Sequence, residues 1–221
     1  MNNLTLIIPA KNEAESLPQV LSEIKNYDCS IIIILEKSDI ETIKSIKDFK
    51  CRIVYQGGRG YGNALIEGIN SVTTDYLCIF NADGSFNPKY LKGMLNLCED
   101  NRDFIFASRY MEGGGSDDDT FLTKIGNFIF SKIGNIFFSL KLSDILYTYL
   151  LGKTKSFKKL NLTSNDFCLC VEMPIKAKKN KMNFTDTPSY ERERIAGKKK
   201  VSEFKDGFKI LTYMVKSFFK I

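Results

Sequence analysis

The stretch Asn81-Ala82-Asp83-Gly84-Ser85 places an amide, a carboxylate and a hydroxyl at every second position. Such groups suit a hard cation such as Mg²⁺ or Mn²⁺, because Mg²⁺ takes only one or two protein carboxylates and completes its shell with water and substrate phosphates. The same residue types are also usual in an ordinary turn between a strand and a helix. Asn81, Asp83 and Ser85 are therefore candidate metal ligands, and a plain turn is the competing interpretation.

The elements around this stretch predict an open sheet of the α/β class. Apolar runs at residues 4–8, 31–35, 51–55, 75–80 and 104–107 favour strands, and the segments between them carry apolar residues at helical spacing. The continuous apolar run of the second strand is typical of a parallel strand covered on both faces. This alternation predicts a Rossmann-like, mostly parallel sheet with helices on both faces.

Polar stretches of the first half all follow predicted strands. They occupy residues 11–13, 36–39, 57–62, 81–85 and 108–109. Ligands of open α/β sheets bind beyond the carboxyl ends of the strands. We therefore expect these five stretches to converge at one edge of the sheet.

The glycine run Gly-Gly-Arg-Gly-Tyr-Gly at residues 57–62 precedes a predicted helix. It lacks the lysine-serine or lysine-threonine ending of a P-loop, and it follows the third strand instead of the first, which excludes the dinucleotide fingerprint. A glycine-rich turn before a helix can hold an anion. For Gly58 and Gly60, a tight turn that packs the helix on the sheet is an equal alternative.

The second half of the chain has a different pattern. Residues 112–119 are acidic and glycine-rich; their aspartates could bind metal, but we expect a mobile, solvated loop. Residues 121–142 predict a large apolar helix interrupted by lysines, and residues 204–221 predict an amphipathic, basic helical extension. Either helix could lie in a membrane interface or cover the core. Between them we expect a helical element at 166–181 and an edge strand at 182–187.

Composition narrows the class of protein. The 221 residues, 43% of them hydrophobic, predict a single domain with halves at 1–108 and 109–221. The absence of histidine excludes His-based triads and His metal sites. The cysteines form no CxxC pair and the start lacks a basic signal-peptide region, so we expect a cytoplasmic protein. The net charge of +6, with lysine clusters at 176–181 and 198–200, suits an anionic partner or a solvated face.

Six short motifs occur in order over about residues 4–210. They are LIIPAKNE (6–13), GRGYGNALIEG (58–68), NADGSFNP (81–88), ASRY (107–110), SD (143–144) and RIAG (194–197). Together they resemble the motifs of the family 2 glycosyltransferases of GT-A fold, in the branch of dolichyl-phosphate mannose synthase and the polyprenyl-phosphate sugar transferases.

This resemblance implies a nucleotide-diphosphate sugar donor, a divalent cation (Mg²⁺ or Mn²⁺) and inversion at the anomeric carbon. Asp83 would hold the cation beside Asn81, and Arg109 and Arg194 would lie near the phosphates or the acceptor. The positions that the resemblance puts around the nucleotide sugar are Pro9, Asn12, Glu13, Glu36, Gly58, Gly60, Asn81, Ala82 and Asp83.

The acceptor implied by the resemblance is a polyprenyl phosphate. A phosphate monoester, with a second pKa of about 6, is already an anion at pH 7 and needs cations instead of a base. Arg109, Arg194, Lys198 and Lys200 could supply them. A saccharide hydroxyl would instead need a carboxylate base. Asp144 is the candidate for that base, and a bond to the backbone or to an arginine is its alternative role.

Two departures from the family pattern leave alternatives open. Asn81 stands where the family usually has aspartate, so metal affinity should fall, and Lys37 follows Glu36 where the family has an acidic pair. A protein that binds a nucleotide sugar without catalysis is therefore a further interpretation. A sugar nucleotidyltransferase would carry a glycine-and-basic signature after the first strand, which is not found there.

Two expectations about partners follow. The apolar and basic second half predicts peripheral contact with the cytoplasmic face of a membrane. We expect no nucleic-acid partner, because the basic residues are not interleaved with a recognisable reading element.

Overall fold

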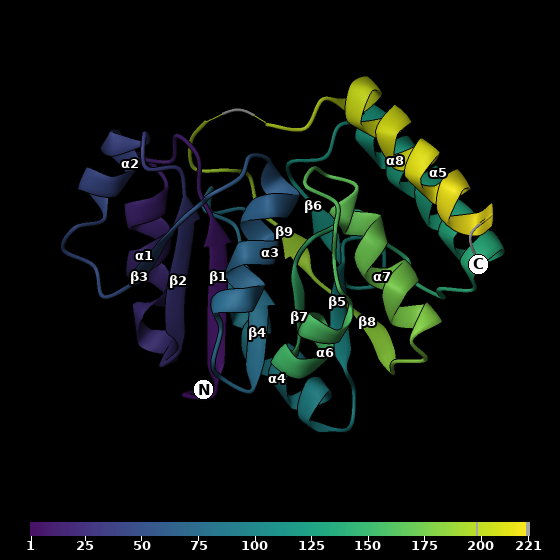
Figure 1. Cartoon of the computed structure of the whole chain (residues 1–221), viewed down its shortest axis with the longest axis horizontal. Coiled ribbons are helices and arrows are strands. Elements are labelled where there is room, and N and C mark those ends of the chain that lie inside the picture. The colour runs from purple at the N-terminus through teal and green to yellow at the C-terminus, as the bar shows by residue number, and fades with distance from the viewer. Residues whose placement is uncertain (198, 220–221) are drawn as a thin grey trace.

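A seven-stranded sheet forms the centre of the protein, in the order β3-β2-β1-β4-β7-β5-β8. The computed structural model describes residues 1–197 and 199–219 (Figure 1). The strands are β1 (Leu4–Pro9), β2 (Ser30–Leu35), β3 (Arg52–Tyr55), β4 (Tyr76–Ile79), β5 (Phe104–Ser108), β7 (Leu150–Lys153) and β8 (Phe184–Pro188). All neighbours are parallel except β7, which is antiparallel to β4 and β5. The predicted α/β class with a mostly parallel sheet is confirmed.

Helices cover both faces of this sheet, as predicted. One face carries α3 (Tyr61–Ser71), α6 (Thr154–Lys159) and α7 (Leu169–Lys179), and the other carries α1 (Leu17–Ile24), α2 (Ile40–Ser45) and α4 (Leu91–Glu99). Side chains of β1 alternate between them: Ile7 packs toward α3, whereas Leu6 and Ile8 pack toward α1. Because every second residue of a strand points to the same face, the continuous apolar runs are what a two-sided core requires.

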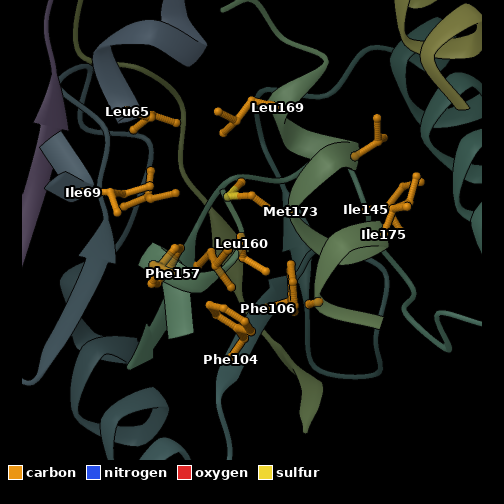
Figure 2. Packing of buried hydrophobic residues seen from close by; sticks show 14 of the residues in the cluster. Leu65, Ile69, Phe104, Phe106, Ile145, Phe157, Leu160, Leu169, Met173 and Ile175 are labelled. Carbon is orange, nitrogen blue, oxygen red and sulfur yellow. The ribbon is translucent and has the colours of Figure 1, made fainter. Parts of the chain in front are cut away.

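The core under α3, α6 and α7 is shown in Figure 2. Phe104 of β5 meets Phe157 of α6 edge to face, with ring centroids 4.8 Å apart. Leu65 of α3 and Met173 of α7 are also buried there. Full burial of a side chain of this size contributes about 1.5–3 kcal/mol. This packing holds the sheet rigid below the edge where the polar stretches converge.

The strand β7 was not predicted. Only four residues long and containing Gly152, it has too weak a local pattern to be recognised, yet it is inserted between β4 and β5. A Cβ on Gly152 would lie 2.5 Å from a ring carbon of Phe104 and 2.6 Å from the carbonyl oxygen of Asp103, so glycine permits the close approach of β5. The second half of the chain thus completes the sheet begun by the first.

Several predicted boundaries shift in the structure. A 3₁₀ turn (Pro88–Tyr90) precedes α4, and a second 3₁₀ turn (Lys25–Tyr27) follows α1. The apolar helix α5 (Phe121–Phe138) ends four residues early, because Ser139 adopts a left-handed conformation with φ of 53°. A small parallel pair, β6 (Gly115–Ser116) and β9 (Tyr190–Glu191), also forms where only loops were expected.

Helices α5 and α8 (Glu203–Phe219) lie side by side at the far end of the molecule from β3 (Figure 1). Both predicted helices are therefore present. Of the helices in residues 1–197 and 199–219, none is both long and apolar enough to cross a bilayer.

Candidate active site

A cavity of about 740 Å³ opens at the carboxyl edge of the sheet, on the side where β1 and β4 end. Eleven residues singled out from the sequence line it: Pro9, Asn12, Glu13, Glu36, Gly60, Asn81, Ala82, Asp83, Arg109, Arg194 and Lys200. The polar strand ends thus converge on one cavity. Three other candidates, Gly58, Ser85 and Asp144, are not among its lining residues.

The glycine run is hydrogen-bonded to the helix that follows it, α3. The backbone amides of Gly57 and Gly58 donate to the Glu67 carboxylate of α3 over 3.0–3.2 Å. Gly60 has φ of +99°, and a Cβ there would lie 2.2 Å from the carbonyl oxygen of Asn165. These contacts are those of a tight turn that packs the following helix on the sheet. Gly58 does not line the cavity.

The turn after β4 orients Asp83 toward the cavity. Gly84 adopts φ of +84°, and the Ser85 amide donates to Oδ1 of Asp83 at 3.0 Å. Asn81 donates from its side-chain nitrogen to the Ser85 hydroxyl at 3.0 Å, so its carbonyl oxygen is the atom suited to a cation. Ser85 itself is buried and forms part of the turn. Ser85 was expected to be a metal ligand, and in the structure it forms hydrogen bonds within the turn.

These donors fit a divalent cation that is shared with a substrate. Asp83 and Asn81 offer two oxygen-bearing side chains at the cavity wall. Within the described part of the chain, no group of three or more carboxylates and cysteines could hold a metal by itself. Mg²⁺ bound through one carboxylate plus substrate phosphates and water matches such a sparse donor set.

Arg109 lies in the wall of the cavity and is surrounded by carboxylates. Its Nε and Nη2 donate to Asp144 at 2.7 and 3.1 Å, and its Nη1 donates to Asp119 at 3.2 Å and to Glu191 at 3.1 Å. Burial disfavours the charged guanidinium, but the negative charges of Asp144 and then Glu191 outweigh this effect and raise the pKa of Arg109. Four of its five N–H groups are therefore engaged, and Arg109 is a fixed part of the wall, not a free phosphate ligand.

The carboxylates around Arg109 outnumber the positive charge. Burial raises the pKa of Glu191, although Arg109 and the Ser116 hydroxyl oppose that shift. Tyr110 donates its hydroxyl to Asp119, which links the cluster to α5 because Asn127 donates to Tyr110 at 2.8 Å. The excess negative charge is a property of the cavity wall that sequence patterns did not indicate.

The acidic segment 112–119, expected to be a solvated loop, is exposed at Glu112 and Asp117 but forms ion pairs at Asp118 and Asp119. The side chains of Asp118 and Asp119 are only 14% and 8% exposed. Asp118 accepts two bonds from Arg194, at 2.7 and 3.2 Å, and pairs with Lys199. Burial alone would raise the pKa of Asp118, but its hydrogen bonds and ion pairs with Arg194 and Lys199 have the larger effect and lower it.

Residues 192–197 and 199–200, which we call the strap, place Arg194, Lys199 and Lys200 in the lining of the cavity. Arg194 pairs with Asp83 at 3.4 Å, and Ile195 donates its amide to the Asp83 carbonyl at 2.8 Å. Lys200 contacts both the Glu13 carboxylate and the Lys11 carbonyl. Lys198, named from the sequence as a possible acceptor ligand, lies outside the described residues.

The far end of the same cavity is apolar. Leu122 and Phe130 of α5 and Phe204 and Ile210 of α8 line it. The outer surfaces of the two helices expose large apolar side chains: Phe121, Ile125, Phe128, Ile129, Ile136, Phe137, Phe204, Phe208, Val215, Phe218 and Phe219. One cavity is therefore lined both by the charged strand ends and by apolar side chains of α5 and α8.

Sequence reasoning missed Glu191 and the roles of Asp118 and Asp119. Glu191 lies two residues from the exposed Glu193. No local pattern separates these two glutamates. The pairing of β9 with β6 decides which of them faces Arg109.

Comparison with known proteins agrees with this geometry. The model of the family "Glycosyl transferase family 2" matches residues 5–161. Glycosyltransferase AglJ of Haloferax volcanii is 23% identical over 188 residues, which is 83% of this chain but only 61% of AglJ. The UDP-N-acetylglucosamine–dolichyl-phosphate N-acetylglucosaminyltransferase of Methanococcus voltae is 24% identical, with 83% of each chain covered.

Among solved structures, glucosyl-3-phosphoglycerate synthase from Mycobacterium tuberculosis, in complex with Mn²⁺, UDP and its product, superposes with a TM-score of 0.77. The match covers 97% of this chain and 79% of that one at 10% identity, so it shows a shared fold. The GT-A fold implied by the sequence motifs is confirmed. Because the family model spans well over half of the chain, this protein belongs to glycosyl transferase family 2.

Proposed function

We propose that the protein is an inverting glycosyltransferase that moves a sugar from a nucleotide-diphosphate sugar to a polyprenyl phosphate. The observation that carries this proposal is the cavity that is lined by Asp83 and Arg194 as well as by apolar side chains of α5 and α8. A charged donor suits one end and a lipid suits the other. The similarity to a protein named as a dolichyl-phosphate transferase supports the same acceptor class.

At the donor end, Pro9, Asn12, Glu13 and Glu36 would surround the nucleotide. Asp83 and Asn81 would hold the cation, whose charge would stabilise the departing nucleoside diphosphate. Arg194 already lies within 3.4 Å of Asp83 and would share that task. The fixed charges at this end thus lie where negative charge develops in the reaction.

At the acceptor end, a lipid phosphate oxygen would attack the anomeric carbon on the face opposite the diphosphate. The new bond from carbon to phosphate oxygen forms while the bond to the diphosphate breaks, and the electron pair leaves with the nucleotide. No proton has to be removed, because the phosphate is already an anion. Arg194 and Lys199 line the cavity and would attract the lipid phosphate, whereas Arg109 is held by its carboxylates.

We further propose that the α5–α8 face rests on the cytoplasmic face of a membrane as a peripheral contact. Exposed phenylalanines such as Phe128 and Phe208 alternate with exposed Lys124, Lys132 and Lys205. Apolar side chains bordered by lysines suit an interface with anionic lipids.

A hydroxyl acceptor is the second candidate, and one observation favours it. Glu191 lines the cavity and has a raised pKa, because it is buried. A carboxylate of this kind could take a proton from a saccharide hydroxyl. Asp144, expected from the sequence as that base, is buried with both oxygens bonded to Arg109.

The test is a transfer assay with radiolabelled UDP-, GDP- and dTDP-sugars and Mn²⁺. The acceptors would be a short polyprenyl phosphate, the matching polyprenol without phosphate, and a saccharide. We expect labelled glycosyl phosphate from the first acceptor alone, with the inverted anomer by NMR. Transfer to the saccharide alone would establish the second candidate instead.

Two variants complete the test. Asp83→Ala should abolish metal-dependent donor binding in calorimetry, while Asp100→Ala at the exposed end of α4 should leave it intact. Asn81→Asp adds a ligand charge and should lower the Mn²⁺ concentration for half-maximal turnover by about tenfold. Donor binding without turnover, even in Asn81→Asp, would show a binding protein and not a transferase.

A further inference from the structure

The strongest unexplained feature is that Arg194 bridges two acidic residues of the cavity. Its Nη1 lies 3.4 Å from Oδ2 of Asp83, and its Nε and Nη2 donate to Asp118 at 3.2 and 2.7 Å. The arginine side chain is 20% exposed, so it lies in the cavity wall within reach of a bound molecule. Asp118 thus anchors a cation directly against the candidate metal ligand.

The charge balance at this point is unusual for a metal site. Asp83 is the only carboxylate of the NADGS turn, because Asn81 contributes no charge. The guanidinium of Arg194 neutralises that single charge. A divalent cation that approached Asp83 alone would lose this ion pair and be repelled by the arginine at close range.

A diphosphate reverses this balance. It brings at least two negative charges, which would accept hydrogen bonds from Arg194 and would offset the charge of a cation held by Asp83. Lys199 pairs with Asp118 at 3.6 Å and donates to its carbonyl at 2.7 Å, so Asp118 stays compensated if Arg194 turns away from Asp83. The same strap places Lys200 on Glu13 at the nucleotide end of the cavity.

We infer that Arg194 couples cation binding to donor binding: it holds Asp83 in the free protein and moves to the diphosphate when cation and nucleotide arrive together. Arg194 is then a positioning residue for the cation as well as a phosphate ligand. The inference rests on the proposed function, because it assumes that a nucleotide diphosphate occupies this cavity. Linkage requires that the nucleotide raises metal affinity by the same factor as metal raises nucleotide affinity.

The test measures Mn²⁺ binding by electron paramagnetic resonance, with Mn²⁺ alone and with whichever of UDP, GDP or dTDP binds. The free wild-type protein should bind Mn²⁺ at least about tenfold more weakly than the protein saturated with nucleotide, within the usual range of coupling between two sites. In Arg194→Gln, the free protein should bind Mn²⁺ more tightly than wild type, and the nucleotide effect should shrink to less than about threefold.

Two controls make the result specific. Arg192→Gln removes a neighbouring arginine of the strap that pairs with Glu23 at 2.8 Å and does not line the cavity, so the coupling should persist. Asp83→Asn should remove Mn²⁺ binding in every background, which assigns the signal to this site. Thermal unfolding of each variant would show that the fold is retained.

An unchanged Mn²⁺ affinity of the free protein in Arg194→Gln would overturn the inference. Equal Mn²⁺ affinity of wild type with and without nucleotide would also overturn it, while leaving the proposed function intact if the donor still binds. If no nucleotide binds at all, the proposed function fails. The Mn²⁺ affinities of wild type and Arg194→Gln without nucleotide still decide whether Arg194 weakens cation binding at Asp83.

Discussion

Arg109 and Asp144 form a bidentate ion pair in which Nε donates to Oδ2 at 2.7 Å and Nη2 donates to Oδ1 at 3.1 Å. The Arg109 backbone amide donates to the same carboxylate at 3.3 Å. The Asp144 side chain is fully buried, so this pair orients the guanidinium toward Asp119 and Glu191 at the cavity wall. An aspartate behind the wall therefore decides the position of a charge within it.

Replacement of this carboxylate should destabilise the protein. Asp144→Asn leaves the charge of Arg109 compensated by Asp119 and Glu191, but it replaces one acceptor oxygen with an N–H donor, and a buried hydrogen-bonding group left without a partner costs about 1–3 kcal/mol. Urea unfolding at pH 7 would measure the change, with the exposed Asp100→Asn as the control that should not alter stability. Full stability combined with lost turnover would argue instead that Asp144 acts in the chemistry.

Substitution by alanine should change protein stability in opposite directions at two helical glycines. In α3, a Cβ on Gly62 would lie 2.1 Å from the Ser164 carbonyl oxygen, and overpacking of this kind costs about 1–3 kcal/mol. In α4, a Cβ on Gly93 would meet nothing within 4 Å, so Gly93→Ala should stabilise by roughly 0.5–1 kcal/mol. Denaturant midpoints of the two variants would be compared with wild type. The same sign for both would contradict the close approach of the 164–166 loop to α3.

Acid should weaken the contact of Glu172 with the loop that precedes α7. Burial opposes its ionisation, but Lys176 and the amides of Thr163 and Ser164 outweigh this and lower the pKa of Glu172. A carboxylate with a lowered folded pKa contributes stability above its unfolded pKa of about 4.3, and this contribution is lost as the pH falls through the folded value.

The variant Glu172→Gln should therefore be less stable than wild type at pH 7. The difference in unfolding free energy between the two proteins should shrink as the pH falls below about 5. Unfolding in urea across this pH range would show the convergence. Glu41→Gln, which removes an exposed partner of Lys44, serves as the control with a small, nearly constant gap. A gap at Glu172 that widens in acid would refute the pKa direction.

The α5–α8 face should bind anionic phospholipid vesicles. Phe208 is 73% exposed on α8, so Phe208→Glu should leave the fold intact while weakening vesicle binding by about tenfold or more, the loss expected for one large apolar side chain. Cosedimentation would measure the change, and Leu97→Glu on the exposed surface of α4 is the matched control. Equal losses for both variants would mean that this face has no special affinity for lipid.

Much of the fold follows from local sequence. Five strands and the helices between them were predicted because their apolar runs are long and their periods distinct, as in residues 31–35 and at Leu17, Val20, Leu21 and Ile24 of α1. The convergence of the strand ends was also predictable, because parallel strands place their carboxyl ends at one edge. Asp83 was singled out in this way, whereas Arg194 was singled out by the resemblance of residues 194–197 to a family motif.

Only the tertiary structure decided the remaining features, because they depend on contacts between distant segments. The pairing partners of β7, with its four residues and Gly152, are set by neighbours and not by its own pattern. Glu191 reaches Arg109 across 82 positions of sequence, and burial then separates it from the exposed Glu193. The amino-acid sequence thus determined which elements form and where the chemistry gathers, whereas packing determined which charges face the cavity and how strongly each is held.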